Sequence, residues 1–154
     1  MYDNEEIGTN TIASPSPPAN TKNKDNNNKI RRILLVDDEA DVLTTLKIGL
    51  ENNGFLVDAF TNPLEALSSF RPSLYDFLLL DVRMPTMNGF ELYREIEKKM
   101  MMIQGKVKVC FITAYEVYYE SLKKEFPGLD VGCFIKKPVV IQDLVKRIKV
   151  QLQQ

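Results

Sequence analysis

The chain of 154 residues contains no histidine. This absence excludes Ser-His-Asp and Cys-His nucleophiles, His-ligated zinc and imidazole general bases. Any chemistry must therefore use carboxylates, hydroxyls, lysines or a hard metal ion.

Long hydrophobic runs and an excess of charge of one sign are also absent. No stretch approaches the roughly 18 consecutive apolar residues of a membrane span, and the acidic N-terminal sequence MYDNEEIG is unlike a signal peptide. The 20 basic and 21 acidic residues give a net charge of −1, which favours neither nucleic-acid nor membrane binding. We expect a cytoplasmic protein with no membrane partner and no direct nucleic-acid partner.

Cysteine is scarce, with two residues, Cys110 and Cys133, both inside apolar segments. Cysteines in such segments are usually buried free thiols, and we expect that state here. A disulfide would imply an oxidising compartment, which nothing else in the sequence indicates.

The first 29 residues differ in composition from the rest. From Ala13 to Lys29 there is no large apolar side chain, and Asn, Pro and Ser are abundant. Such a segment cannot bury enough surface to offset the entropy lost on ordering. We therefore predict a disordered tail over residues 1–29 and one domain over residues 30–154.

Within that domain, short apolar runs alternate with amphipathic stretches, which predicts an α/β fold with five strands and five helices. The expected strands cover residues 32–36, 55–60, 76–81, 106–113 and 131–136. Helical crossovers between them make the sheet parallel, and near-continuous apolar strands suit a sheet covered on both faces. Met100, Met101 and Met102 end one helix and are expected to fill the core rather than bind a soft metal.

Ligands of such sheets bind beyond the carboxyl ends of the strands. The residues that end strands one, three, four and five are polar, namely Asp37 and Asp38, Asp81, Thr113, and Lys137 before Pro138. Carboxylates at close range repel one another unless a cation joins them, and an all-oxygen ligand set suits Mg²⁺. Asp81 can act as a nucleophile towards phosphorus, and Lys137 can hold a phosphoryl group.

Simpler interpretations exist for each residue taken alone. Asp37 and Asp38 are well placed to cap the following helix. Thr113 is an ordinary strand former, and Phe134 is compatible with a place in the core. The clustering of these residue types at several strand ends favours the chemical interpretation.

The segments LLVDDE, LLLDVRMPTMNG, FITA and IKKP, in this order and spacing, resemble the receiver domain of two-component response regulators over roughly residues 31–152. The resemblance implies a flavodoxin-like, doubly wound sheet in the strand order 2-1-3-4-5. It implies that Asp81 is the phosphoacceptor, and that Mg²⁺ is bound by Asp38 and Asp81, by Asp37 through water, and by the backbone carbonyl of Arg83.

The resemblance also implies roles around the phosphoryl group. Thr113 and Phe134 are the switch residues and Lys137 contacts the phosphoryl group, while a cis peptide bond precedes Pro138. A histidine kinase or phosphotransfer protein donates the phosphoryl group, and the response is passed to a downstream protein. The chain is a monomer or a phosphorylation-dependent dimer, and it is not an enzyme beyond its own phosphorylation and dephosphorylation.

Because four residues follow the last helical stripe, we expect a stand-alone receiver. Two alternatives remain open. The first is a pseudo-receiver that is never phosphorylated, and the second is an aspartyl-nucleophile phosphatase of the haloacid dehalogenase type. The phosphatase requires a second aspartate two residues after the nucleophile, where this chain has Arg83.

Overall fold

The computed structural model describes residues 29–114, 118–125, 127 and 133–154, and within them it contains one parallel sheet of five strands. The strands are β1 (Arg32–Val36), β2 (Leu56–Phe60), β3 (Phe77–Asp81), β4 (Lys108–Thr113) and β5 (Phe134–Lys136). Their spatial order is β2-β1-β3-β4-β5. The predicted fold class and strand order are therefore confirmed. The tail predicted at residues 1–29 lies outside the described residues except for Lys29.

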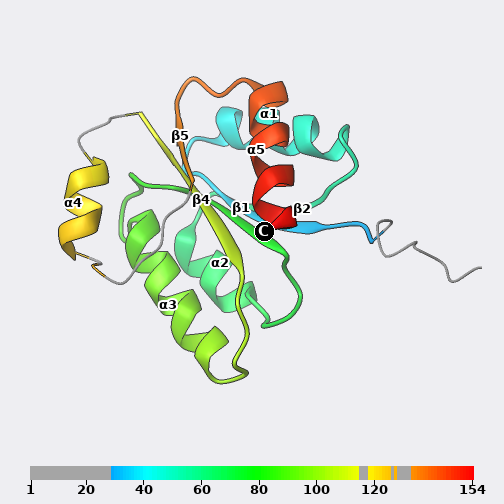
Figure 1. The fold of residues 1–154 in the computed structure, drawn as a ribbon. Helices are drawn as coiled ribbons and strands as arrows, with labels where there is room; N and C mark the ends of the chain where they lie inside the picture. The colour runs from blue at the N-terminus through cyan, green and yellow to red at the C-terminus, as the bar shows by residue number, and fades with distance from the viewer. Residues whose placement is uncertain (1–28, 115–117, 126, 128–132) are drawn as a thin grey trace, which may run out of the picture.

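Five helices alternate with the strands along the chain. They are α1 (Ala40–Glu51), α2 (Pro63–Ser69), α3 (Gly89–Met101), α4 (Tyr118–Glu125) and α5 (Ile141–Gln153). Figure 1 shows α1 and α5 on one side of the sheet and α2, α3 and α4 on the other. Among the described residues, no helix combines the length and apolar character that crossing a bilayer requires.

The alternation of side chains along β1 and β3 explains why both strands are apolar throughout. Leu34 and Leu78 belong to the core under α2 and α3, whereas Leu35 and Leu79 belong to the core under α1 and α5. Successive side chains of a strand point to opposite faces of its sheet, so a sheet covered on both faces needs apolar residues at every position.

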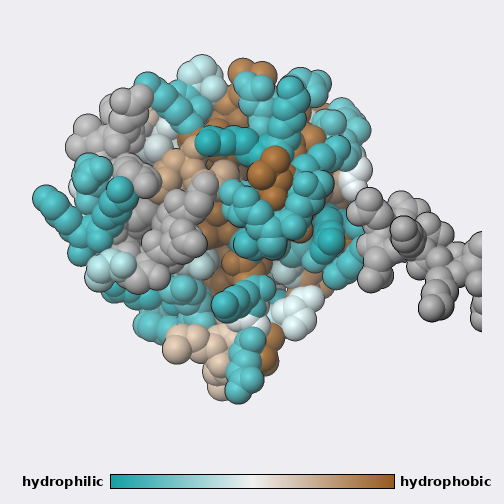
Figure 2. Space-filling model, in the orientation of Figure 1, coloured by the Kyte–Doolittle hydropathy of each residue, from teal (hydrophilic) through white to brown (hydrophobic). Residues whose placement is uncertain are grey.

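The methionine run at the end of α3 is only partly in the core. Met100 is buried at 6% exposure, whereas Met101 and Met102 are 76% and 87% exposed. The expectation that all three fill the core is therefore wrong. Helix α3 ends at Met101, and of the three methionines only Met100 lies on the buried face of the helix. Figure 2 shows mainly hydrophilic surface in this view, with hydrophobic residues at the end where α3 leads into β4.

Candidate functional site

The carboxyl edge of the sheet carries the buried polar residues of the described chain, which are Asp37, Asp81 and Thr113. All five residues of β3 are buried, and Asp81, its last residue, is 3% exposed. Asp37 follows β1 and is fully buried. Because burying a carboxylate without partners is costly, the surroundings of these two aspartates define what the site can do.

Lys137 lies among these carboxylates. Its Nζ is 2.9 Å from Asp37 Oδ2, 3.2 Å from Glu39 Oε1 and 3.5 Å from Asp81 Oδ2. The backbone positions the lysine, because Lys137 N donates to Thr113 O at 2.8 Å at the end of the β4–β5 pair. The Lys137–Pro138 peptide bond is cis, as the resemblance implies.

The two carboxylate oxygens of Asp37 have different surroundings. Oδ1 accepts a hydrogen bond of 2.9 Å from Glu39 N. Because Glu39 is itself the N-cap of α1 and that helix has no side-chain cap hydrogen bond, the interpretation of Asp37 as a helix cap is wrong. Oδ2 is fully buried and lies beside the Lys137 ammonium, but no described donor reaches it with hydrogen-bond geometry. A buried carboxylate oxygen that can still accept a hydrogen bond is suited to bind a cation, or a water molecule that a cation holds.

Electrostatic effects at the site keep Asp81 hard to ionise and Lys137 charged. Burial raises the pKa of Asp81 to about 7; the Asp37 charge and a hydrogen bond with Asp38 add to this, and the Lys137 charge opposes it. Burial lowers the pKa of Lys137, but the adjacent Asp37 carboxylate and the charge of Asp81 outweigh burial, and the net shift is upward. One ammonium therefore does not neutralise the clustered acids.

This excess of negative charge fits a divalent cation. Ligand oxygens of Asp37, Asp38 and Glu39 lie within 4.8 Å of one another, and the hydrogen bond with Asp38 brings Asp81 to the same place. All of these donors are oxygens, which is the set that Mg²⁺ prefers. Asp38 and Arg83 also line a hollow of about 600 Å³ beside α4, so the site is open to solvent and to a phosphoryl donor.

The residues predicted as switches lie further along the sheet edge. Thr113 ends β4 and is in register with Lys136 of β5. Phe134 begins β5, where its ring lies 5.7 Å from that of Phe111 and packs against the core under α2 and α3. Thr113 thus belongs to the site, while Phe134 is connected to it through β4 and β5.

Sequence reasoning missed two contributors. Glu39 is an ion-pair partner of Lys137, and the run of three acids from Asp37 is the signal for it. Gly89 begins α3 directly behind Asp81, after Asn88, whose side chain forms a capping box with Glu91. Asparagine is a common N-cap residue, but the sequence does not tell how closely the helix that follows Asn88 approaches Asp81.

Gly89→Ala is expected to destabilise the domain and to move Asp81. A Cβ at this position would lie 2.2 Å from the Asp81 carbonyl oxygen, so backbone must shift, at a cost of about 1–3 kcal/mol in the free energy of unfolding. Urea denaturation measures this loss. Gly105→Ala is the matched control, because its Cβ would meet the flexible ends of Met100 and Ile103; equal losses in the two variants would contradict the packing argument.

Asp81→Asn is expected to stabilise the metal-free protein above neutral pH. The folded pKa of about 7 lies above the unfolded value of about 3.9, so the Asp81 charge lowers stability as pH rises from about 4 to 7. Above pH 7 we expect the variant to melt about 5 °C higher in EDTA, and below pH 4 we expect no difference. Asp41→Asn, at an exposed aspartate of α1, should show no gain; a wild-type protein as stable as Asp81→Asn at pH 8 would contradict the electrostatic argument.

A parallel sheet in the order β2-β1-β3-β4-β5, with acids and a lysine at its carboxyl edge, defines a class of signalling domain. Residues 33–149 match the family model described as the response regulator receiver domain. The chain belongs to this family, whose members are receiver domains of two-component systems and act as signalling modules. Receiver domains generally bind Mg²⁺ in an acidic pocket, and the acidic cluster at Asp37, Asp38 and Glu39 is of this kind.

Individual relatives and solved structures agree with this assignment. The chain is 32% identical over 125 residues to the transcriptional regulatory protein PrrA of Mycobacterium tuberculosis, covering 80% of this chain and 50% of PrrA. It is similar to a CheY-like receiver domain of Methanospirillum hungatei, with a TM-score of 0.67, 30% identity and coverage of 81% and 95%. It is also similar to the response regulator TrrA of Thermotoga maritima in complex with Mg²⁺-BeF, with a TM-score of 0.66, 31% identity and coverage of 79% and 99%.

These relatives correct one expectation about partners. The net charge led to the expectation of no direct nucleic-acid partner, yet similar proteins are transcriptional regulatory proteins. The chain spans about half the length of these curated relatives. Length and net charge of the aligned half carry no information about the remainder of such proteins, and the exclusion is therefore wrong.

Proposed function

We propose that this receiver accepts a phosphoryl group on the Asp81 carboxylate from a phosphohistidine of a histidine kinase or phosphotransfer protein. The phosphohistidine must lie outside these 154 residues, because they contain no histidine. The observation that carries the proposal is the buried Asp81 carboxylate with the Lys137 ammonium 3.5 Å away at the carboxyl edge of the sheet. We further propose that this transfer takes place in the cytoplasm.

The transfer is a displacement at phosphorus. An Asp81 oxygen attacks the phosphorus atom, the O–P bond forms, the P–N bond of phosphohistidine breaks, and the imidazole nitrogen takes the electron pair. Lys137 holds a positive charge beside the attacked group throughout, which stabilises the negative charge on the transferred oxygens. Asp38, Asp81 and the backbone carbonyl of Arg83, with Asp37 acting through water, would hold Mg²⁺, which would supply further neutralisation of that charge.

The consequence of phosphorylation is a change of surface. Thr113 supplies a hydroxyl for a phosphoryl oxygen, and its displacement is transmitted along β4 and β5 to Phe134. Phe134 lies half-buried against Phe111, so a change in its packing alters the surface formed by β5 and its neighbouring helices. A downstream protein then reads that surface.

The proposal is tested with acetyl phosphate and Mg²⁺, using intact-protein mass spectrometry. We expect a mass gain of one phosphoryl group in the wild-type chain and none in Asp81→Asn. Asp41→Asn, which alters an exposed aspartate of α1, should still gain the group. A wild-type protein that neither gains mass nor binds beryllofluoride would instead be a pseudo-receiver, and rapid hydrolysis of many phosphate esters would indicate a phosphatase.

A further inference from the structure

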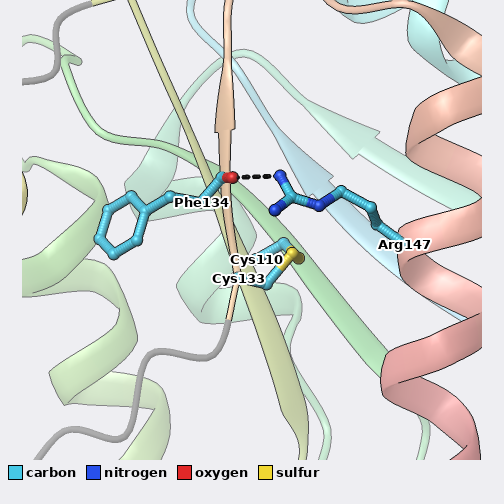
Figure 3. The surroundings of a disulfide bond; sticks show 4 residues. All are labelled: Cys110, Cys133, Phe134 and Arg147. Carbon is cyan, nitrogen blue, oxygen red and sulfur yellow. Dashed lines mark hydrogen bonds between the residues drawn. A yellow bond between two sulfur atoms is a disulfide. The ribbon is translucent and has the colours of Figure 1, made fainter.

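Cys110 and Cys133 form a disulfide that joins β4 to the residue before β5 (Figure 3). The expectation of two free thiols is therefore wrong. The sequence could not reveal this pairing, because it depends on the spatial approach of the two residues, whose Cα atoms lie 4.6 Å apart although 23 positions separate them in the chain.

The disulfide is placed next to the predicted switch. Cys110 immediately precedes Phe111, and Cys133 immediately precedes Phe134; these two aromatic residues are in register across β4 and β5. Their rings lie 5.7 Å apart. A covalent bond between the two preceding residues therefore fixes the spacing of the strands where the switch ring packs.

A second tether holds Phe134 on the same face of the sheet as the disulfide, whose cysteines belong to the core under α1 and α5. Arg147 of α5 donates a hydrogen bond from Nη1 to the Phe134 carbonyl oxygen. Figure 3 shows the Phe134 ring pointing away from Arg147 and towards the side of the sheet that carries α3. The backbone at Phe134 is therefore held twice, by the disulfide of the preceding residue Cys133 and by the hydrogen bond from Arg147 to its own carbonyl oxygen. It has little freedom to move while both bonds are in place.

We propose that the Cys110–Cys133 disulfide is a reducible tether that sets how readily the β4–β5 switch responds to phosphorylation; this inference rests on the proposed function of Asp81. The intact disulfide holds β4 and β5 at the spacing seen in this structure, and it opposes a change in the position of Phe134 that would require a different spacing. Reduction by a dithiol breaks the S–S bond. Two electrons and two protons pass to the sulfurs, two thiols form, and the dithiol becomes a disulfide.

The proposed cytoplasmic location favours a regulatory role for this disulfide over a purely structural one. Disulfides are rare in reducing compartments, and those found there are usually transient or redox-sensing. Both cysteines are buried, at 0% and 1% exposure, so a thiolate reaches either sulfur only when the start of β5 opens. Because coupling is reciprocal, a tether that opposes the phosphorylated arrangement must be easier to reduce once that arrangement is stabilised.

The test is the affinity of the full chain for beryllofluoride in the presence of Mg²⁺. One sample is oxidised, the other is reduced with dithiothreitol and freed of it without oxygen, and both are titrated by calorimetry. We expect the reduced protein to bind about fivefold more tightly or better. The Cys110→Ala/Cys133→Ala variant should bind like the reduced protein and show no response to dithiothreitol.

A second measurement needs no variant. Wild-type protein is equilibrated in a dithiothreitol redox buffer with and without beryllofluoride and Mg²⁺, and free thiols are counted by alkylation and mass. We expect beryllofluoride to raise the reduced-to-oxidised ratio by the same factor as the affinity change.

The outcomes separate this inference from the proposed function. Equal beryllofluoride affinity of the two redox forms, or tighter binding by the oxidised form, would overturn the tether and leave phosphorylation of Asp81 intact. Absence of binding in both forms would overturn both. Two alkylatable thiols after exposure of the folded protein to an oxidising dithiothreitol buffer would overturn the tether directly.

Discussion

Replacing Lys137 with methionine is expected to slow phosphorylation of Asp81 by acetyl phosphate by about a hundredfold. The Lys137 ammonium lies 3.5 Å from Asp81 Oδ2 and 2.9 Å from Asp37 Oδ2. Methionine retains much of the length of the side chain but not its charge, so the negative charge of the transferred group is no longer balanced from that side. The initial rate of mass gain measures the effect.

Lys136→Met is the matched control for this prediction. Lys136 precedes Lys137 in the chain and is exposed at the end of β5, whereas the Lys137 ammonium lies beside Asp37 and Asp81. We expect its variant to be phosphorylated at close to the wild-type rate. A large loss of rate in Lys136→Met with little loss in Lys137→Met would contradict the assignment of the lysine.

Replacing Asp38 with asparagine is expected to weaken Mg²⁺ binding by more than about tenfold. Asp38 is one of the clustered acids whose oxygens lie within 4.8 Å of one another, and it also hydrogen-bonds Asp81. The amide keeps the shape of the side chain but removes the charge that a hard divalent cation requires. The Mg²⁺ concentration that gives half the maximal phosphorylation rate measures the loss.

Glu39→Gln distinguishes between two possible ligand sets. Glu39 belongs to the same acidic cluster, but its side chain is 62% exposed and pairs with Lys137 at 3.2 Å. We expect its variant to change the Mg²⁺ requirement little, because the proposed ligands are Asp37, Asp38 and Asp81. A loss in Glu39→Gln as large as that in Asp38→Asn would contradict the proposed set.

The fold was predictable from the sequence because the spacing of the apolar residues indicates the strands and helices, and the polar residues at the strand ends indicate the site. Leu34 and Leu35 face opposite layers of the core, so the unbroken apolar run in β1 is the direct signature of a sheet covered on both sides. Parallel strands bring their carboxyl ends to one edge of the sheet, which predicts that Asp37, Asp81 and Lys137 lie close together. The strand order came from the resemblance.

What sequence reasoning missed depends on distances between segments that are remote in the chain. The pairing of Cys110 with Cys133 requires two particular Cα atoms to approach, and the residue types alone are equally typical of free thiols. The close approach of Gly89 to the Asp81 carbonyl is likewise a property of helix packing. The residue type of Met102 favours burial, and its exposure could be predicted only by knowing that α3 ends at Met101.

The most direct test of the account is to locate the phosphoryl group chemically. Protein phosphorylated with acetyl phosphate and Mg²⁺ is treated with borohydride, which reduces an aspartyl phosphate to homoserine, and the modified peptide is sequenced by mass spectrometry. We predict homoserine at position 81 and unmodified aspartates at positions 37 and 38. Homoserine at another aspartate, or a stable phosphate ester on a serine or threonine with Asp81 unmodified, would contradict the assignment of Asp81 as the phosphoacceptor.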